Sequence, residues 1–214
     1  MTAMTARPRV KICGLTRAED AELAVALGAD AIGFVFWPKS PRHIERADAR
    51  AIASRLGPFV TRVGVFVDAS PDDVSATVRD VGLDVVQLHG DENVADYAGV
   101  PARLVKAVAL GDEKSVETAM QLPPAVMPLA DAFDAVRRGG TGQLAHWPHA
   151  ARVALRRPLV LAGGLRPENI RDAIRTVRPW GVDVSSGVED APGLKSPERL
   201  RQLFAAVAAA TEVL

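Results

Sequence analysis

The sequence predicts a single α/β domain of the (β/α)8 type, a TIM barrel in which parallel strands alternate with helices. Short β-branched runs alternate with Ala-, Leu-, Arg- and Glu-rich stretches along the whole chain, and the strand-like runs number eight. The alternating units are fairly uniform in length, which favours a closed barrel. An open doubly wound sheet has the same alternation, but no G-x-G-x-x-G follows the first run to indicate a dinucleotide-binding fold.

Each predicted strand is a short run of apolar and β-branched residues. In chain order the runs are Arg9–Leu15, Ala31–Phe36, Thr61–Val67, Asp84–His89, Arg103–Leu110, Ala125–Asp131, Pro158–Ala162 and Gly181–Ser185. The stretches between them carry apolar residues three and four positions apart, which indicates amphipathic helices. Clear examples are Ala18–Leu27, Asp48–Leu56, Asp72–Val81, Pro167–Val177 and Pro197–Ala209.

Helix boundaries have their own signals. Ser70-Pro71 and Ser196-Pro197 place a capping serine before a proline at the first helical position. Gly28 and Gly82 follow two of the helices, where glycine ends a helix readily.

Composition limits the possible classes. The 214 residues are 48% hydrophobic and 24% charged, which excludes a disordered tail or a disulfide scaffold. We expect one domain over residues 1–214, with residues 1–8 as a flexible N-terminal extension. The 26 basic and 26 acidic residues balance, so no overall field favours nucleic acid or a membrane surface. One cysteine and the lack of a signal peptide or membrane-length apolar run predict a cytoplasmic protein.

In a barrel, the residues at the carboxyl ends of the strands form the catalytic face. Here the glycines that follow the last strands predict a phosphate site, because glycine lets backbone N–H groups approach an anion closely. The expected phosphate-binding residues are Gly140, Thr141, Gly142, Gly163, Gly164, Ser185, Ser186 and Gly187. For any one of these segments, an ordinary βα turn is the alternative.

Cys13 and Asp131 end two strands and could act as base and acid. Cys13 shares a strand face with Lys11, whose ammonium group would favour the thiolate, although a lone cysteine is more often a small buried hydrophobe. Asp131 follows apolar residues that could keep it protonated, or it could cap the following loop. Asp134 competes with Asp131 for the role of acid.

Further polar residues lie where a substrate would contact the strand ends. Arg42 could bind a substrate carboxylate bidentately, or be a solvated loop arginine. Gln87 and His89 share a strand face and could order substrate hydroxyls, or be bonded within the barrel core. No cluster of side chains has metal-ligand spacing, so we expect no metal site.

These residues belong to segments that resemble the phosphoribosylanthranilate isomerase family of tryptophan biosynthesis. The similarity runs in order along nearly the whole chain. It includes Val10–Thr16, Gly28–Phe36, Pro38–Arg42, Val63–Val67, Val86–Glu92, Leu161–Leu165, Pro167–Asn169, Val182–Glu189 and Pro192-Gly193. The stretch Ala130–Trp147 is the least typical of the family.

The resemblance implies a (β/α)8 barrel that catalyses an Amadori rearrangement without a cofactor. The reaction converts N-(5-phosphoribosyl)anthranilate to 1-(2-carboxyphenylamino)-1-deoxyribulose 5-phosphate. It implies Cys13 as general base and Asp131 as general acid, with Arg42 on the anthranilate carboxylate and Asp183 near the ribose hydroxyls. With these we group Lys11, Gln87 and His89 as substrate-binding.

Two other functions fit part of the pattern. One is an isomerase of the related histidine-pathway aminoaldose, whose enzymes resemble a two-aspartate pattern without Lys-Ile-Cys-Gly. The other is a non-catalytic barrel that binds a phosphometabolite, which would need neither Cys13 nor Asp131. The expected partner is a small phosphosugar, and the protein is expected to be a monomer or a homodimer.

Overall fold

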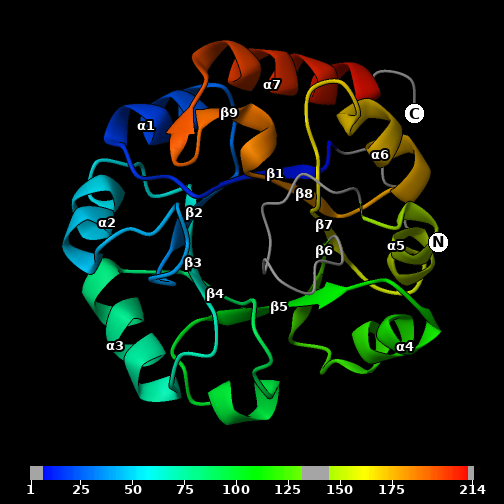
Figure 1. The fold of residues 1–214 in the computed structure, drawn as a ribbon, viewed down its shortest axis with the longest axis horizontal. Helices are drawn as coiled ribbons and strands as arrows, with labels where there is room; N and C mark the ends of the chain where they lie inside the picture. The colour runs from blue at the N-terminus through cyan, green and yellow to red at the C-terminus, as the bar shows by residue number, and fades with distance from the viewer. Residues whose placement is uncertain (1–6, 132–144, 212–214) are drawn as a thin grey trace.

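The computed structural model describes residues 7–131 and 145–211, and their eight main strands form one closed barrel (Figure 1). The strands follow chain order around the barrel, and β1 pairs in parallel with both β2 and β8, which closes the sheet. The predicted fold class is therefore confirmed. The expected extension over residues 1–8 lies mostly outside the described residues, but Arg7 forms an ion pair with Asp30.

The strands lie where the sequence predicts them. They are β1 Arg9–Cys13, β2 Ala31–Val35, β3 Thr61–Phe66, β4 Val85–Leu88, β5 Arg103–Ala109, β6 Met127–Asp131, β7 Val160–Leu161 and β8 Gly181–Val184. Most end one or two residues before the predicted boundary. His89 and Ala162, just past β4 and β7, still donate a backbone hydrogen bond to the neighbouring strand before the chain leaves the sheet. These exit residues line the C-terminal end of the barrel.

Helices cover the outside of the barrel. They are α1 Ala18–Ala26, α2 Arg46–Ala53, α3 Pro71–Val81, α4 Glu113–Gln121, α5 Trp147–Ala154, α6 Ile170–Val177 and α7 Pro197–Thr211, with short 3-10 turns η1 Val94–Tyr97 and η2 Ser186–Val188. The Ser70 side chain caps α3 by accepting from the Asp73 N–H, and Gly82 ends it with a φ of +74°. The predicted capping serine and terminal glycine of this helix are therefore confirmed.

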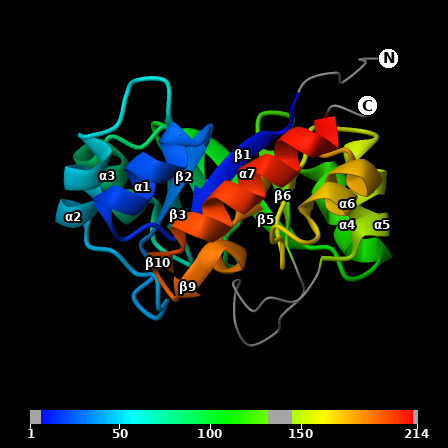
Figure 2. The same ribbon diagram turned by 90° about the horizontal axis from the view of Figure 1, so that it is seen from above.

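Helix α2 lies two to three residues before its predicted range, and two further features differ from the prediction. Helix α6 begins at Ile170 rather than Pro167, because Asn169 turns back and accepts a hydrogen bond from the Arg166 N–H. After β8 the chain forms a small antiparallel hairpin, β9 Glu189–Ala191 and β10 Leu194–Lys195, that the eightfold pattern does not predict. Figure 2 shows this hairpin at the opposite end of the barrel from the N-terminus.

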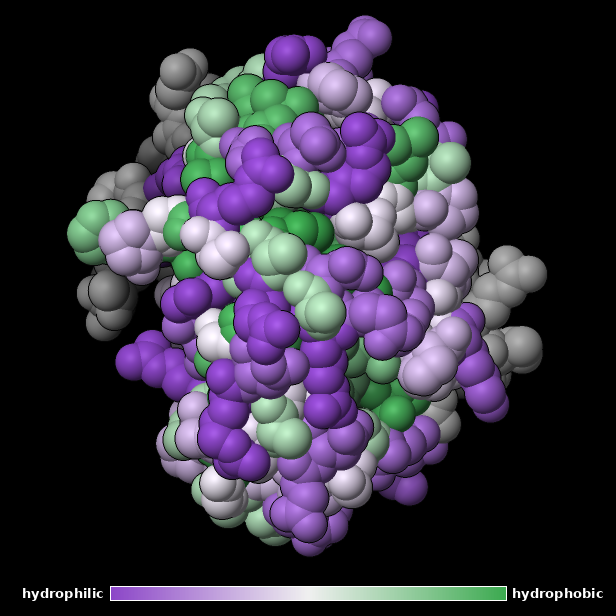
Figure 3. Space-filling model, turned by 90° about the vertical axis from the view of Figure 1, so that its left-hand side faces the viewer, coloured by the Kyte–Doolittle hydropathy of each residue, from purple (hydrophilic) through white to green (hydrophobic). Residues whose placement is uncertain are grey.

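The hydrophobic core lies mainly between the strands and the helices. Side chains alternate along a strand, so Val10 and Ile12 of β1 are fully buried under the helices while Lys11 and Cys13 line the barrel interior. Figure 3 shows that the outer face over α2 and α3 is mostly hydrophilic, in keeping with the Arg46–Asp73 and Arg50–Asp80 ion pairs there. Among the described helices, none is long and apolar enough to cross a membrane.

Candidate active site

A cavity of about 510 Å³ opens at the C-terminal end of the barrel. Polar side chains from several strand ends converge on it, among them Cys13, Gln87, His89, Asp131 and Asp183. A larger cavity of about 740 Å³ lies at the opposite end, but its lining is mostly apolar. The smaller cavity is the candidate active site, because barrel enzymes react at this end and the titratable groups meet there.

Cys13 shares one corner of this cavity with Lys11 and Asp183. Lys11 Nζ lies 2.8 Å from Asp183 Oδ2, and both side chains are about nine-tenths buried. Gly33 on β2 makes room for them, since a Cβ there would approach Cys13 Sγ to 2.8 Å and Lys11 Nζ to 3.0 Å. Sequence reasoning did not predict a role for Gly33, because only the β1–β2 register places it beside Cys13.

The charge state of Cys13 differs from the sequence prediction. Burial raises the pKa of the Cys13 thiol, and the Asp183 carboxylate raises it further. Lys11 lowers this pKa, as the shared face predicts, but does not outweigh burial. Burial lowers the pKa of Lys11 itself, but Asp183 and Cys13 more than offset this and raise it, so Lys11 stays charged. The isolated protein therefore keeps Cys13 mainly as the thiol near neutral pH.

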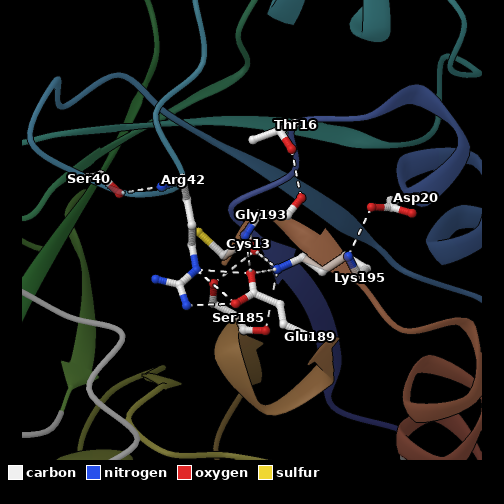
Figure 4. A network of polar contacts seen from close by, with 9 residues as sticks. All are labelled: Cys13, Thr16, Asp20, Ser40, Arg42, Ser185, Glu189, Gly193 and Lys195. Carbon is white, nitrogen blue, oxygen red and sulfur yellow. Dashed lines mark hydrogen bonds and ion pairs between the residues drawn. The ribbon is translucent and has the colours of Figure 1, made fainter. Parts of the chain in front are cut away.

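Arg42, predicted to bind a carboxylate, already has one within the protein. Its Nε and Nη2 form a two-point contact with the Glu189 carboxylate at 2.7–3.1 Å, as Figure 4 shows. The Nη1 edge of the guanidinium points away from Glu189. Arginine has donors on two edges, so a second carboxylate could bind end-on. The solvated-loop alternative is wrong, because only 11% of the Arg42 side chain is exposed.

Lys195 links Glu189 to the backbone carbonyl of Cys13. Its Nζ lies 2.7 Å from Glu189 Oε1 and donates to the Cys13 carbonyl at 2.6 Å. Its side chain is fully buried, and its backbone N–H donates to Asp20. Burial raises the pKa of Glu189, but Arg42 and Lys195 outweigh it and lower that pKa. Neither Glu189 nor Lys195 has a predicted role, and the signal that could have indicated Glu189 is its place at the end of the resembling segment Val182–Glu189.

Asp131 stands on the far side of the cavity in a chain of side-chain hydrogen bonds. His89 Nε2 lies 3.0 Å from Asp131 Oδ2, and Gln87 Nε2 lies 2.9 Å from His89 Nδ1. Gln87 is 2% exposed, and its Oε1 has no hydrogen-bond partner among the described residues. The sequence left open substrate binding or bonding within the barrel for Gln87 and His89, and the structure shows bonds between them and to Asp131, which lines the same cavity.

A further buried ion pair, between Lys106 and Glu92, supports the loop that carries His89. Glu92 accepts from the backbone N–H groups of Asp68 and Gly90, and Lys106 Nζ lies 2.7 Å from its Oε2. Asp68 has a φ of +51°, an unusual backbone conformation for a residue with a side chain. These bonds tie the ends of β3, β4 and β5 together.

The late glycine turns line the cavity as predicted. Gly163, Gly164, Ser185 and Ser186 all contribute to its wall. Gly163 and Gly164 have φ values of +81° and +61°, and a Cβ on Gly187 would collide with the Leu165 carbonyl. Side chains at Gly163 and Gly164 would strain the backbone, whereas Gly187 is required by its close packing against the Leu165 carbonyl. The other predicted phosphate residues, Gly140, Thr141 and Gly142, lie outside the described residues, as does Asp134.

Within residues 7–131 and 145–211, no group of three or more His, Cys, Asp or Glu side chains could hold a metal ion. The cavity brings together the Cys13 thiol, the Asp131 carboxyl group, the Lys11–Asp183 ion pair and the late glycine turns. That set is suited to proton transfer on a bound phosphate ester.

Comparison with known proteins gives a consistent result. A family model described as N-(5'-phosphoribosyl)anthranilate isomerase matches residues 10–206. The chain is 45% identical over 208 residues to the N-(5'-phosphoribosyl)anthranilate isomerase of Chromohalobacter salexigens, covering 97% of each chain. It is 46% identical over 196 residues to that of Geobacter sulfurreducens, covering 92% of this chain and 96% of the relative.

Solved structures agree. The phosphoribosyl anthranilate isomerase of Thermotoga maritima superposes with a TM-score of 0.88 at 41% identity, covering 94% of this chain and 99% of the other. Another phosphoribosyl anthranilate isomerase was solved in complex with reduced 1-(o-carboxyphenylamino)-1-deoxyribulose 5-phosphate. It superposes with a TM-score of 0.82 at 42% identity, with the same coverage.

Proposed function

The chain belongs to the N-(5'-phosphoribosyl)anthranilate isomerase family, and from this premise we propose that Cys13 and Asp131 are its general base and general acid. The protein is an aldose–ketose isomerase of tryptophan biosynthesis that acts on phosphoribosylanthranilate. The observation that carries the assignment of roles is that the Cys13 thiol and the Asp131 carboxyl group face a single cavity from different strands, while the other carboxyl group there, that of Asp183, is paired with Lys11. A protein that only binds a phosphometabolite requires neither group.

The reaction needs one acid and one base. Asp131 gives its proton to the furanose ring oxygen as the bond between that oxygen and C1 breaks, and the amine lone pair forms the C1=N bond. The Cys13 thiolate then takes the proton from C2, and the electron pair forms the C1=C2 bond of an enolamine. Protonation at C1 and loss of the C2 hydroxyl proton give the ketose. The net number of protons is unchanged.

The thiolate has to form in a site that favours the thiol. Lys11 offsets part of the free-energy cost of forming the thiolate, because its charge lowers the pKa of Cys13 while burial and Asp183 raise it. If Asp183 turns toward the ribose hydroxyls of a bound substrate, its effect on Cys13 weakens and the thiolate becomes easier to form. Binding of the substrate hydroxyls by Asp183 would then also promote formation of the Cys13 thiolate.

The remaining contacts position the substrate. Arg42 binds the anthranilate carboxylate with the guanidinium edge that Glu189 does not use. The backbone of the Gly163–Gly164 turn and of residues 185–187 holds the phosphate, far from the reacting carbons, where its binding energy supports catalysis. Lys11 acts through Cys13 and Asp183. Gln87 Oε1 has no partner among the described residues and could accept from a substrate hydroxyl.

The proposal also covers the cellular location and the oligomeric state of the protein. A cytoplasmic place fits a biosynthetic enzyme with a free cysteine. A relative from Thermotoga maritima is described as dimeric. For this chain a monomer or a homodimer is the proposal, and analytical ultracentrifugation decides between them.

The decisive experiment follows the fluorescence of freshly prepared phosphoribosylanthranilate as the purified protein consumes it. Wild type should remove the signal. Cys13→Ala and Asp131→Asn should lower kcat by about 10²-fold or more, since each removes one proton-transfer group. Turnover of Asp131→Asn at the wild-type rate would move the role of acid to Asp134. If the folded wild type showed no turnover, the proposed activity would be wrong. The alternative of a non-catalytic barrel that binds a phosphometabolite would then replace it.

A further inference from the structure

We propose that Glu189 is a positioning residue that orients Arg42 so that its free edge selects a substrate carboxylate, an inference that rests on the proposed function. Lys195 belongs to the same cluster, because its charge balances that of Glu189 and leaves the charge of Arg42 for the ligand. The bonds that carry this inference are the two-point contact between Arg42 and Glu189 at 2.7–3.1 Å and the 2.7 Å contact between Lys195 Nζ and Glu189 Oε1 (Figure 4).

The Arg42 side chain is held at both of its ends. Its stem lies against Gly14, where a Cβ would approach Arg42 Cδ to 2.5 Å, and its backbone N–H donates to Ser40 Oγ at 3.1 Å. Its guanidinium donates to Glu189 through Nε and Nη2. A carboxylate bound in this way fixes the plane of the guanidinium, so the Nη1 edge has one direction. Because Arg42 lines the cavity and Nη1 points away from Glu189, a ligand in the cavity meets this edge.

The Glu189 carboxylate meets only donors in the described part of the chain. They belong to Arg42, to Lys195 Nζ and to the Gly193 backbone N–H, which lies 3.3 Å from Oε1. The Glu189 side chain is 4% exposed. Burial raises its pKa, but Arg42 and Lys195 outweigh burial and lower that pKa. Glu189 is therefore an ionised group whose oxygens are fixed by their donors, and it can fix Arg42 in turn.

The charges of this cluster do not cancel. The Lys195 side chain is fully buried, and burial lowers its pKa. Its ammonium group still has an acceptor for each of its three hydrogens, namely Glu189 Oε1, the Cys13 carbonyl at 2.6 Å and the Ser185 carbonyl at 3.4 Å. Lys195 and Arg42 are thus two cations that share one carboxylate. One positive charge remains, and a ligand carboxylate would balance it.

The role of Lys195 follows from the repulsion between two carboxylates. A ligand carboxylate on the Nη1 edge of Arg42 lies near the negative charge of Glu189, which repels it. Lys195 contacts Glu189 directly and offsets this repulsion, so one guanidinium can bind two carboxylates at once. The cluster should therefore favour a ligand with a carboxylate over the same ligand without one.

The test measures this carboxylate preference with two stable ligands. One is reduced 1-(o-carboxyphenylamino)-1-deoxyribulose 5-phosphate, and the other is its phenylamino counterpart, which lacks the carboxylate. Isothermal titration calorimetry gives the dissociation constant of each ligand, and the ratio of the two constants is the preference. Wild type should prefer the first ligand about ten- to a hundredfold, the usual effect of a hydrogen bond to a charged group. Arg42→Ala should abolish the preference and sets its lower limit.

Glu189→Met combined with Lys195→Met removes the orienting contact and keeps the charge. One anion and one cation are lost together, so the cluster still carries the single charge of Arg42. Apolar replacement of both partners of a buried pair is often tolerated, whereas loss of one partner is not. We expect the carboxylate preference to fall about tenfold in this double variant.

Glu189→Gln combined with Lys195→Met is the conservative version. It has the same charge, and its amide oxygen can still accept from Arg42, so it should retain part of the preference. The inference predicts a fall in both double variants, so either one tests it if the other does not fold.

Glu92→Met combined with Lys106→Met is the matched control. Lys106 Nζ also bonds one buried glutamate and one backbone carbonyl, that of Gly90, both at 2.7 Å. Neither Glu92 nor Lys106 is among the residues that line the cavity. This variant should keep the carboxylate preference of wild type, even if both ligands bind more weakly.

Three outcomes would overturn the inference. They are a wild-type preference in the folded Glu189 variants, an equal fall in the Glu92 control, and a wild type that binds both ligands equally well. The first two would leave Glu189 a purely structural residue. Failure of the proposed function is a different result, because wild type would then not consume phosphoribosylanthranilate. A wild type that turns over this substrate but shows no carboxylate preference would overturn the present inference alone.

Discussion

The base side and the acid side of the active site are held in place by different kinds of bond. Around Cys13 the polar groups are charged and buried, with the Lys11–Asp183 pair on one side and the Arg42–Glu189–Lys195 cluster on the other. Around Asp131 the bonds run through the side chains of Gln87 and His89. One side depends on a balance of full charges and the other on a chain of side-chain hydrogen bonds.

This difference indicates how substitutions on each side should affect the protein. Buried ions are stable only together, since removing one partner leaves an uncompensated charge in a medium that solvates it poorly. A neutral hydrogen bond contributes about 1 kcal/mol, and its loss is felt mainly at the group it serves. Substitutions on the base side should therefore affect folding and binding, and those on the acid side should affect the chemical step.

The largest expected effect is on folding. Lys195→Met removes the fully buried cation that bonds Glu189 and the Cys13 carbonyl. We expect the free energy of unfolding to fall by about 3–5 kcal/mol, as for other broken buried pairs. Urea denaturation measures it. Arg50→Gln, which breaks the exposed Arg50–Asp80 pair, is the control and should cost no more than about 1 kcal/mol. Equal losses in the two variants would remove the contrast between buried and exposed pairs.

A smaller effect is expected on substrate binding. Arg42→Ala should raise KM about ten- to a hundredfold with a lesser change in kcat, because the carboxylate is bound both before and during the reaction. Arg42→Lys keeps the charge but loses the two-edged geometry, so it should recover only part of the affinity. Steady-state kinetics decide the point. An unchanged KM in Arg42→Ala would confine Arg42 to its structural bond with Glu189.

The smallest effect is a shift in the pH at which Cys13 reacts. Lys11 lowers the pKa of this thiol and Asp183 raises it, so Lys11→Met should move thiolate formation to higher pH and Asp183→Asn to lower pH. A shift of one unit corresponds to about 1.4 kcal/mol. The rate of alkylation by iodoacetamide against pH reports it, and Cys13 is the only cysteine in the sequence.

Lys39→Gln, at the exposed rim of the same cavity, is the control for this measurement and should leave the pH dependence as in wild type. Shifts of Lys11→Met and Asp183→Asn in the same direction would contradict the opposed roles of the two charges.

Local sequence signals predicted most of the fold. The eight strands, the capping serine of α3 and its terminal glycine depend on residues a few positions apart, and each was predicted correctly. The approximate strand ends were enough to single out Cys13, Asp131 and the late glycine turns. Where a boundary was wrong, as at the start of α6, the cause was a side-chain bond from Asn169 that propensity does not encode.

The sequence by itself determined the barrel and the residues at its catalytic end, because strand alternation and helix periodicity are short-range properties. Only the tertiary structure decided how those residues are bonded. Arg42 meets Glu189 across 147 positions, and Lys195 meets the Cys13 carbonyl across 182. The charge of Cys13 was likewise decided by burial, which outweighs the neighbouring lysine. Contacts and desolvation of this kind exist only after the barrel closes and brings β8 back beside β1.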